Sequence, residues 1–367
     1  MKQSGYVRFA VALGLAVTLA AGGARAQWKP DAAGFAPHAI EIQAKPIRSF
    51  SKAGTPFANS RLAWRGGLVL TSPSKYFGGW SGLAFDGNGR RFVSVSDSGV
   101  WMTGELAYDD QDRPQSIRGA RIGAFQTLKG KPLDRARDRD AEAVALAAGT
   151  PEKGTAYVAF EQHDRIGVFP IAKGVLGKPS SYLTMPKEAA RMRMDGIEGL
   201  TVLAGGPNKG ALVAFAEHPL RGEKRHRGWI WIGGTPRGFT LSGASGFGVT
   251  DAASLPDGGL LVLERRFRWL EGLRIRLRHI AAADVKPGAD VTGEILLEAD
   301  TAQEIDNLEA LAVSRGRDGE TVVTMMSDDN FNRFLQRTLL VQFTLKETQT
   351  ARATEGAAPQ EEIQKKK

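Results

Sequence analysis

The sequence contains no cysteine, and this absence removes several possibilities at once. Neither a disulfide nor a lipid-modified cysteine anchor can form, although an exported chain has access to both. Beyond residue 26, no apolar run is long enough to cross a bilayer as a helix. Basic residues are scattered and are not interleaved with aromatic residues in a patch. We therefore expect no membrane span and no nucleic-acid partner.

Several local catalytic signatures are also missing. The strings GWSGL (79–83) and GASGF (243–247) lack the glycine two residues after the serine that a nucleophile elbow requires. There is no Arg-His-Gly string of the histidine phosphatases and no HExxH zinc motif. A function has to be inferred from the distribution of residues over the whole chain.

Residues 1–26 have the features of a signal peptide. Lys2 and Arg8 supply the positive start, residues 9–21 are apolar, and Ala24-Arg25-Ala26 forms a small-x-small cleavage site before Gln27. No twin arginine precedes the apolar stretch, which favours the general secretory route. We predict an exported protein, periplasmic or extracellular.

Composition divides the remainder of the chain. The formal net charge is +9, and the leader carries three basic residues and no acidic one, so the mature chain is only mildly basic, at about +6. Residues 346–367 are polar and biased in composition, and we expect them to be disordered. Residues 27–60 are an N-terminal segment, and 61–345 are long enough for one large all-β domain.

An internal repeat organises this domain. Five short, apolar, β-branched runs each end in a carboxylate, and each run follows a second motif. The pair recurs every 54 to 60 residues. The second motifs read WSGLAF, DAEAVAL, DGIEGLTV, TDAASL and DNLEALAV. Repetition at such a period indicates a radial or solenoid architecture.

The repeats predict an all-β fold, a five-bladed β-propeller. Most units contain four strand-like runs separated by turn signals such as FDGNGR and LPDGG. The last repeat has only three, and the run at 62–72 supplies a fourth. We expect this N-terminal strand to complete the last blade and close the ring, leaving no open edge. Residues 36–52 also read as strand-like, so six blades are the alternative.

The acids of the repeat are predicted to meet at one mouth of the central channel. Neighbouring strands are antiparallel, so the start of the first strand and the end of the second lie at the same rim. Three repeats separate these two acids by 19 residues. The inner ring is Glu142, Glu198, Asp251 and Glu309, with Ser81 in the first repeat, and the outer ring is Asp97, Glu161, Glu217, Glu264 and Asp328.

Nine carboxylates at one mouth require compensation, because like charges repel and raise one another's pKa. A hard cation bound by many oxygens would provide it, and Ca²⁺ suits such a set. Arginines are the other source of compensation. Arg265 and Arg333, which follow two of the acids, are candidates for holding an anionic substrate or for pairing with the acids. The acids are also open to a purely structural interpretation, as partners of turn amides and arginines.

Two histidines follow acids of the outer ring. His163 lies two residues after Glu161, and His218 directly follows Glu217. Topology brings both to the same mouth, where each is a candidate general acid or base, or simply a solvated loop residue.

The repeat motifs resemble those of the phytase-like family, also described as "esterase-like activity of phytase". The residues that carry the resemblance extend over roughly 60–345, and the most specific are LPDGGLLVLERRF (255–267) and SDDNFNRFLQRTLL (327–340). The remainder are GGWSGLAFD, VSDSG, DAEAVA, DGIEGL and DNLEALAV. This resemblance implies a β-propeller exported by bacteria, and its name suggests phosphoester or ester hydrolysis.

Three hypotheses follow. The first is a Ca²⁺-dependent hydrolase of phosphoesters or related esters, acting on a small anionic or ester substrate at the mouth. The second is a non-catalytic propeller in which a structural Ca²⁺ stiffens the channel and the rim binds a ligand or a protein. The third is a lactonase-like propeller hydrolase, which shares the metal and needs a histidine in place of the arginines.

Overall fold

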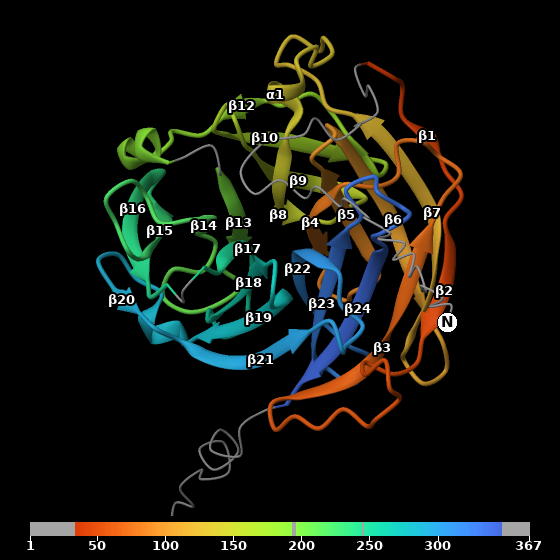
Figure 1. The fold of residues 1–367 in the computed structure, drawn as a ribbon. Coiled ribbons are helices and arrows are strands. Elements are labelled where there is room, and N and C mark those ends of the chain that lie inside the picture. The colour runs from red at the N-terminus through yellow and green to blue at the C-terminus, as the bar shows by residue number, and fades with distance from the viewer. Residues whose placement is uncertain (1–33, 193–195, 244–245, 347–367) are drawn as a thin grey trace, which may run out of the picture.

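A computed structural model describes residues 34–192, 196–243 and 246–346, which form a ring of five sheets around a central channel (Figure 1). The predicted leader and all of the predicted tail except Lys346 lie outside these residues. Among the described residues, helix is confined to the short segments α1 (Ala136–Arg139), η1 (Lys187–Arg191) and η2 (Ala282–Asp284). The prediction of an all-β, five-bladed propeller is confirmed. Within the described ranges, no helix is long and apolar enough to cross a bilayer.

Each blade begins at the channel and adds strands outward. The first contains β4 (Trp80–Phe85), β5 (Arg91–Ser96), β6 (Val100–Tyr108), β7 (Pro114–Ala124) and the edge strand β1 (His38–Ala39). The second contains β8 (Ala141–Gly149), β9 (Lys153–Phe160), β10 (Arg165–Ala172) and two short strands that both pair with β10, β11 (Val175–Leu176) and β12 (Ser181–Tyr182). The third contains β13 (Ile197–Val202), β14 (Leu212–Ala216), β15 (His226–Ile232), β16 (Thr235–Leu241) and, parallel to β16, β20 (Asp290–Val291).

The last two blades differ in how they are completed. The fourth contains β17 (Gly248–Ser254), β18 (Leu260–Arg268), β19 (Gly272–Ile280) and β21 (Glu294–Asp300). The fifth contains β22 (Asn307–Arg315), β23 (Thr321–Asp328), β24 (Thr338–Leu345), β3 (Leu62–Thr71) and β2 (Gln43–Ile47).

The N-terminal strand closes the ring as predicted. β3 pairs with β24 along its length, with Leu68 opposite Leu340, so the last blade is built from both ends of the chain. The alternative of a sixth blade is wrong. Residues 36–52 instead supply β1 to the edge of the first blade and β2 to the edge of the fifth. These additions cover strand edges that would otherwise be open.

Apolar residues pack between blades and leave the channel ends chemically different. The inner strands β4, β8, β13, β17 and β22 lie side by side around the channel. Further along these strands, Leu83, Val144, Leu200, Ala253 and Leu311 help to line a cavity of about 140 Å³. The acids lie near the starts of the same strands. The channel is therefore acidic at the mouth and lined by uncharged residues further along.

Candidate metal centre

A β-bulge at the start of every inner strand positions the mouth residues. The strand pairing skips one residue in each blade, and the skipped residues are Ser81, Glu142, Glu198, Thr250 and Glu309. A bulged residue leaves the regular alternation of the strand, and bulges re-aim side chains at the rims of β-structures. The repeat therefore presents one side chain per blade at the mouth.

The second strand of each blade contributes a further side chain at the same rim. In each second strand, one residue pairs with the residue that precedes the bulge. The next residue along the second strand is the one presented at the rim, and in chain order these residues are Asp97, Glu161, Glu217, Arg265 and Asp328. Four of the five are acids. The bulge position and this position together form a two-residue unit that recurs around the ring.

In the fourth blade, the residues at the mouth are each one position away from those that the sequence predicts. The sequence places Asp251 and Glu264 in the two rings, whereas the structure places Thr250 and Arg265 there. Val249 pairs with Glu264 and Asp251 pairs with Leu263, so the skipped residue is Thr250. Since successive strand residues face opposite sides, a shift of one residue sends both acids elsewhere.

Asp251 connects three blades through the backbone. Its two carboxylate oxygens accept hydrogen bonds from the N–H groups of Leu311 (2.7 Å), Ala252 (2.7 Å) and Leu200 (3.4 Å). The carboxylate is buried, and burial raises its pKa well above the ordinary value although these three donors oppose the shift. Its hydrogen-bond partners are backbone groups, so its role is structural, which agrees with the structural interpretation of the repeat acids.

Glu264 forms a buried ion pair inside its own blade. The guanidinium of Arg278 donates to both carboxylate oxygens, with Nη2 2.8 Å from Oε1 and Nε 3.0 Å from Oε2. Both side chains are buried, and Arg278 also donates to the carbonyl oxygen of Thr292 (2.6 Å). Burial raises the pKa of Glu264 while Arg278 lowers it. This acid is therefore engaged away from the mouth.

The other seven predicted acids converge. Their carboxylates interact electrostatically with one another across the channel, and Arg265 lies among them. We call this group the mouth cluster: Asp97, Glu142, Glu161, Glu198, Glu217, Arg265, Glu309 and Asp328. The first, second, third and fifth blades supply the acids, and the fourth blade supplies the arginine.

Burial and mutual repulsion both act on the mouth cluster. Burial, followed by the charges of Asp140 and Asp97, raises the pKa of Glu142 well above its usual range. Burial and Glu217 do the same for Glu198. Burial raises the pKa of Glu309 to about 7 although Arg265 opposes it. A buried carboxylate surrounded by others remains ionised only if a cation compensates, so the cluster favours a positive ligand.

Two acids of the mouth cluster, together with Asp140, have the spacing of a cation site. Oxygens of Asp140, Glu142 and Glu161 lie within 4.8 Å of one another. Ligand oxygens 2.3–2.6 Å from a shared Ca²⁺ lie at most about 5 Å apart, so the donor set fits a hard cation. Asp140 was missed in the sequence, although it stands two residues before Glu142 in the DAEAVAL motif. This spacing was the signal in the sequence from which Asp140 could have been predicted as a ligand.

The fourth blade supplies the compensating charge within the cluster. The Nη1 atom of Arg265 lies 3.6 Å from Oε1 of Glu309, and its Nη2 atom lies 3.8 Å from Oε1 of Glu217. Nη1 also donates a hydrogen bond to the side-chain oxygen of Asn307. Burial works against the charge of Arg265, but the surrounding carboxylates raise its pKa, so the guanidinium stays protonated.

Arg333, the other arginine predicted to bind substrate, contacts backbone carbonyl oxygens. Its guanidinium donates to the carbonyl oxygens of Phe77 (2.8 Å), Ser74 (3.2 Å) and Ser72 (3.3 Å). It therefore fastens the loop after β23 to the loop before β4. The sequence could not distinguish the two arginines, because both follow an acid of the repeat.

The two histidines occupy different surroundings. The Nδ1 atom of His218 lies 3.0 Å from Oε2 of Glu217, a member of the mouth cluster. The Nδ1 atom of His163 lies 3.2 Å from Oδ1 of Asp138, and its ring is exposed to solvent. Only His218 is held against a mouth acid by a contact of this kind within the described part of the chain.

Backbone conformation is unusual within three residues after two of the mouth acids. Gln162 follows Glu161 with a φ of 56°, and Asn330 and Phe331 follow Asp328 with φ of 47° and 52°. Such left-handed residues other than glycine store strain and concentrate at functional sites. At Gly79 an added Cβ would lie 2.2 Å from Oδ1 of Asp97, so only glycine lets this acid lie against the segment that precedes β4.

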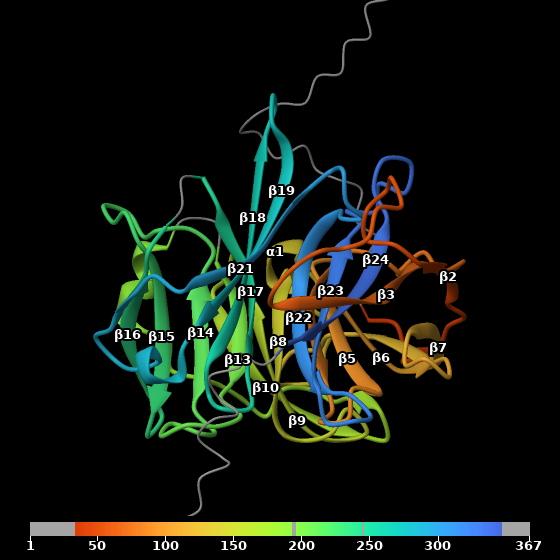
Figure 2. The same cartoon turned by 90° about the horizontal axis from the view of Figure 1, so that it is seen from below.

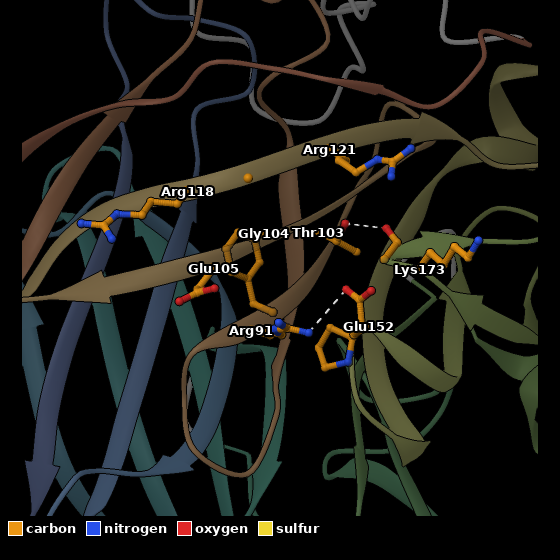
Figure 3. A pocket seen from close by; sticks show the side chains of 12 residues that line it. Arg91, Thr103, Gly104, Glu105, Arg118, Arg121, Glu152 and Lys173 are labelled. Carbon is orange, nitrogen blue, oxygen red and sulfur yellow. Dashed lines mark hydrogen bonds and ion pairs between the residues drawn. The ribbon is translucent and has the colours of Figure 1, made fainter.

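A separate concave region lies between the first and second blades. It has a volume of about 540 Å³ and is lined by Arg91, Arg118, Arg121, Lys173, Glu105 and Glu152, among others (Figure 3). Nη1 of Arg91 lies 3.5 Å from Oε2 of Glu152, and both side chains are about half exposed. The residues that line it include no member of the mouth cluster, so size alone does not identify the chemical site.

The fold and the site define a β-propeller with a carboxylate-lined channel mouth. A family model described as "Phytase-like: Esterase-like activity of phytase" matches residues 75–331. The chain belongs to this phytase-like family, as its motifs predicted. No curated protein matches it. Among solved structures, a chain in "Crystal structure of Nidogen/Laminin Complex" is 13% identical, with a TM-score of 0.39 and coverage of 72% of this chain and 86% of that one. That likeness is too low to bear on function.

Proposed function

We propose that this protein is an exported, Ca²⁺-dependent hydrolase of phosphoesters or related esters, with its site at the mouth cluster. The observation that carries the proposal is the convergence of seven buried or half-buried carboxylates from four blades on one opening, with Arg265 among them. Membership of the phytase-like family supports a hydrolytic activity. The predicted leader supports export.

Asp140, Glu142 and Glu161 would hold the ion, since their oxygens lie within 4.8 Å of one another. The donor set is entirely carboxylate, which suits Ca²⁺ better than softer metals. Asp97 acts on Glu142 electrostatically and extends the site toward the first blade. Bound Ca²⁺ would polarise the ester oxygen and lower the pKa of a water molecule.

Two side chains of the same mouth would complete the chemistry. The guanidinium of Arg265 neutralises and orients the anionic group of a phosphoester, since it is charged, planar and partly exposed. His218 exchanges a proton with water or with the leaving group. Oε2 of Glu217 lies 3.0 Å from Nδ1 of His218, which places the imidazole beside an acid of the mouth cluster.

Hydrolysis is tested with p-nitrophenyl phosphate and p-nitrophenyl acetate, each with chelator and after Ca²⁺ is restored. We expect turnover that chelator abolishes and Ca²⁺ recovers. The variant Arg265→Gln should raise KM for the phosphate by about tenfold and leave KM for the neutral acetate unchanged, because only the phosphate uses the cation. Equal turnover with and without chelator would contradict the proposal.

The second candidate function is a non-catalytic propeller that binds a ligand or a protein. It is favoured by the contacts of Arg265, whose guanidinium is already engaged by Asn307, Glu309 and Glu217. If Ca²⁺ raises the melting temperature while neither ester is turned over, this candidate replaces the first.

The contact between His218 and Glu217 favours a third candidate, a lactonase-like hydrolase, which the same assay can test. A γ-lactone substrate added to the two esters distinguishes it. Preferential lactone turnover that is lost in His218→Gln and kept in Arg265→Gln would favour this third candidate. Export is tested separately, by N-terminal sequencing of the processed chain, which should begin at Gln27.

A further inference from the structure

The hairpin formed by β18 and β19 extends beyond the blade that carries it. β17 pairs with β18 only as far as Arg265, and β21 pairs with β19 only as far as Arg274. Between these points the two hairpin strands pair only with each other, with Phe267 opposite Leu273 and Arg268 opposite Gly272. Figure 2 shows the hairpin projecting from the ring. Its tip therefore has no neighbouring strand.

The tip of this hairpin carries apolar side chains in solvent. Phe267 is 57% exposed, Trp269 64% and Leu270 93%. The loop between β23 and β24 also exposes apolar side chains, Phe334 (94%) and Leu335 (69%). These five account for most of the seven large apolar side chains that are exposed in the described part of the chain. Both segments follow the second strand of their blade, so they lie on the same face as the mouth cluster.

Both tips are held in place. The carboxylate of Glu271 contacts Arg268 (2.9 Å) and Arg266 (2.5 Å) across the hairpin turn. The carbonyl contacts of Arg333 fasten the other loop. Within that loop the Asn332 carbonyl oxygen accepts the N–H of Leu335 at 2.9 Å. The apolar side chains are thus presented by ordered turns.

We propose that these two tips dock the mouth face of the propeller onto an anionic lipid surface. Tryptophan and apolar side chains at the end of a projecting loop enter the headgroup region of a bilayer, and nearby arginines attract its phosphates. The hairpin tip has three arginines, Arg266, Arg268 and Arg274, against one acid, Glu271. Its local charge is positive.

The shape of the surface favours lipid over a protein partner. A whole aromatic side chain covers about 150–250 Å², so each tip exposes roughly 300–400 Å² of apolar surface. A stable protein interface needs about 800 Å² per partner with close shape complementarity. The two tips approach this area only together, and as separate convex segments they form no continuous complementary face, whereas a fluid bilayer adapts to them. The tip stands roughly 13 Å beyond Arg265 along the strand, so docking would turn the mouth toward the membrane.

The test uses the chain from Gln27 onward, which keeps every described residue and removes the apolar leader that would itself bind lipid. Co-sedimentation is measured with phosphatidylcholine vesicles and with vesicles that also contain phosphatidylglycerol. We expect binding to the anionic vesicles, weakened by salt, and a blue shift of tryptophan fluorescence that is lost in Trp269→Ser. The double variants Trp269→Ser/Leu270→Ser and Phe334→Ser/Leu335→Ser should each bind at least tenfold more weakly.

The matched control is Leu128→Ser/Ile295→Ser, which removes exposed apolar side chains elsewhere and should leave vesicle binding unchanged. Melting temperatures show whether each variant still folds. The proposal is overturned if the parent chain stays in the supernatant, if the tip variants sediment like the parent, or if the tips drive self-association in the absence of lipid. The last result would indicate a second copy of the chain as the occupant.

Discussion

The second and fourth blades share one repeat but present opposite charges at the mouth. The second blade places Glu142 and Glu161 there, with Asp140 beside them, and the fourth places Thr250 and Arg265 at the equivalent positions. The mouth is therefore polarised across its width. A cation fits on the side of the second blade, and an anionic group fits near the fourth.

The difference also shows that an acid in the repeat motif is not by itself a mouth acid. The fourth blade has an acid in both motifs, yet Asp251 holds backbone N–H groups of neighbouring blades and Glu264 pairs with Arg278. These acids have structural roles, whereas Glu142 is surrounded by other carboxylates. Substitutions in the two blades should separate the two roles.

The largest effect is expected from Glu264→Gln. The change leaves the Arg278 guanidinium buried without its countercharge, and breaking a buried pair in this way costs about 3–5 kcal/mol of unfolding free energy. Urea denaturation in the presence of chelator measures it. The matched variant Glu142→Gln removes repulsion and should leave metal-free stability unchanged or higher. Equal losses in the two variants would refute the distinction between the blades.

Asp251→Ala should be the next most damaging change. It removes the acceptor for the N–H groups of Leu311, Ala252 and Leu200, which are buried at the contacts of three blades. We expect a loss of about 3 kcal/mol, since an unsatisfied buried donor costs about 1–3 kcal/mol. The loss should be the same with and without Ca²⁺, as followed by thermal denaturation. A loss that Ca²⁺ reverses would place Asp251 in the metal site.

The metal-free protein should become less stable as pH rises. The folded state raises the pKa of Glu309 to about 7 from an ordinary value of 4.5, so it binds a proton more tightly than the unfolded chain does. This contribution is fully present below pH 4.5 and is lost as pH rises through about 7, which amounts to about 3 kcal/mol.

Denaturation midpoints in chelator from pH 5 to pH 8 measure this slope, and Glu309→Gln should reduce it. Added Ca²⁺ should flatten the slope, because the ion binds the deprotonated cluster. A metal-free midpoint that rises with pH in this window would contradict the assignment of Glu309 to a buried acid cluster.

The smallest expected effect is the stabilisation by Ca²⁺ itself. An ion at 100 times its Kd should add about 2.7 kcal/mol to the unfolding free energy. Glu142→Gln should abolish this increment, and Glu198→Gln and Glu309→Gln should reduce it. The control is Glu152→Gln, an exposed acid paired with Arg91 far from the mouth, which should keep the full increment. Ca²⁺ stabilisation that survives Glu142→Gln would remove the ion from the second blade.

The sequence predicted the architecture well and the site unevenly. The repeat predicted five blades, confirmed by the five sheets, and the three-stranded last repeat predicted closure by an N-terminal strand, confirmed by the pairing of β3 with β24. Seven of the nine predicted acids converge on the mouth. Asp140 and Thr250 were missed, and Arg333, Asp251 and Glu264 lie in structural contacts.

The sequence by itself determined the number of blades and the end of the channel that is acidic, because a repeated motif carries a repeated strand pattern. Only the tertiary structure decided which side chain each blade presents there. A bulge moves the presented residue by one position, and its location depends on pairing between strands. The choice between Glu264 and Arg265 was set by Arg278, fourteen residues away, which draws the acid into the blade and leaves the arginine at the mouth.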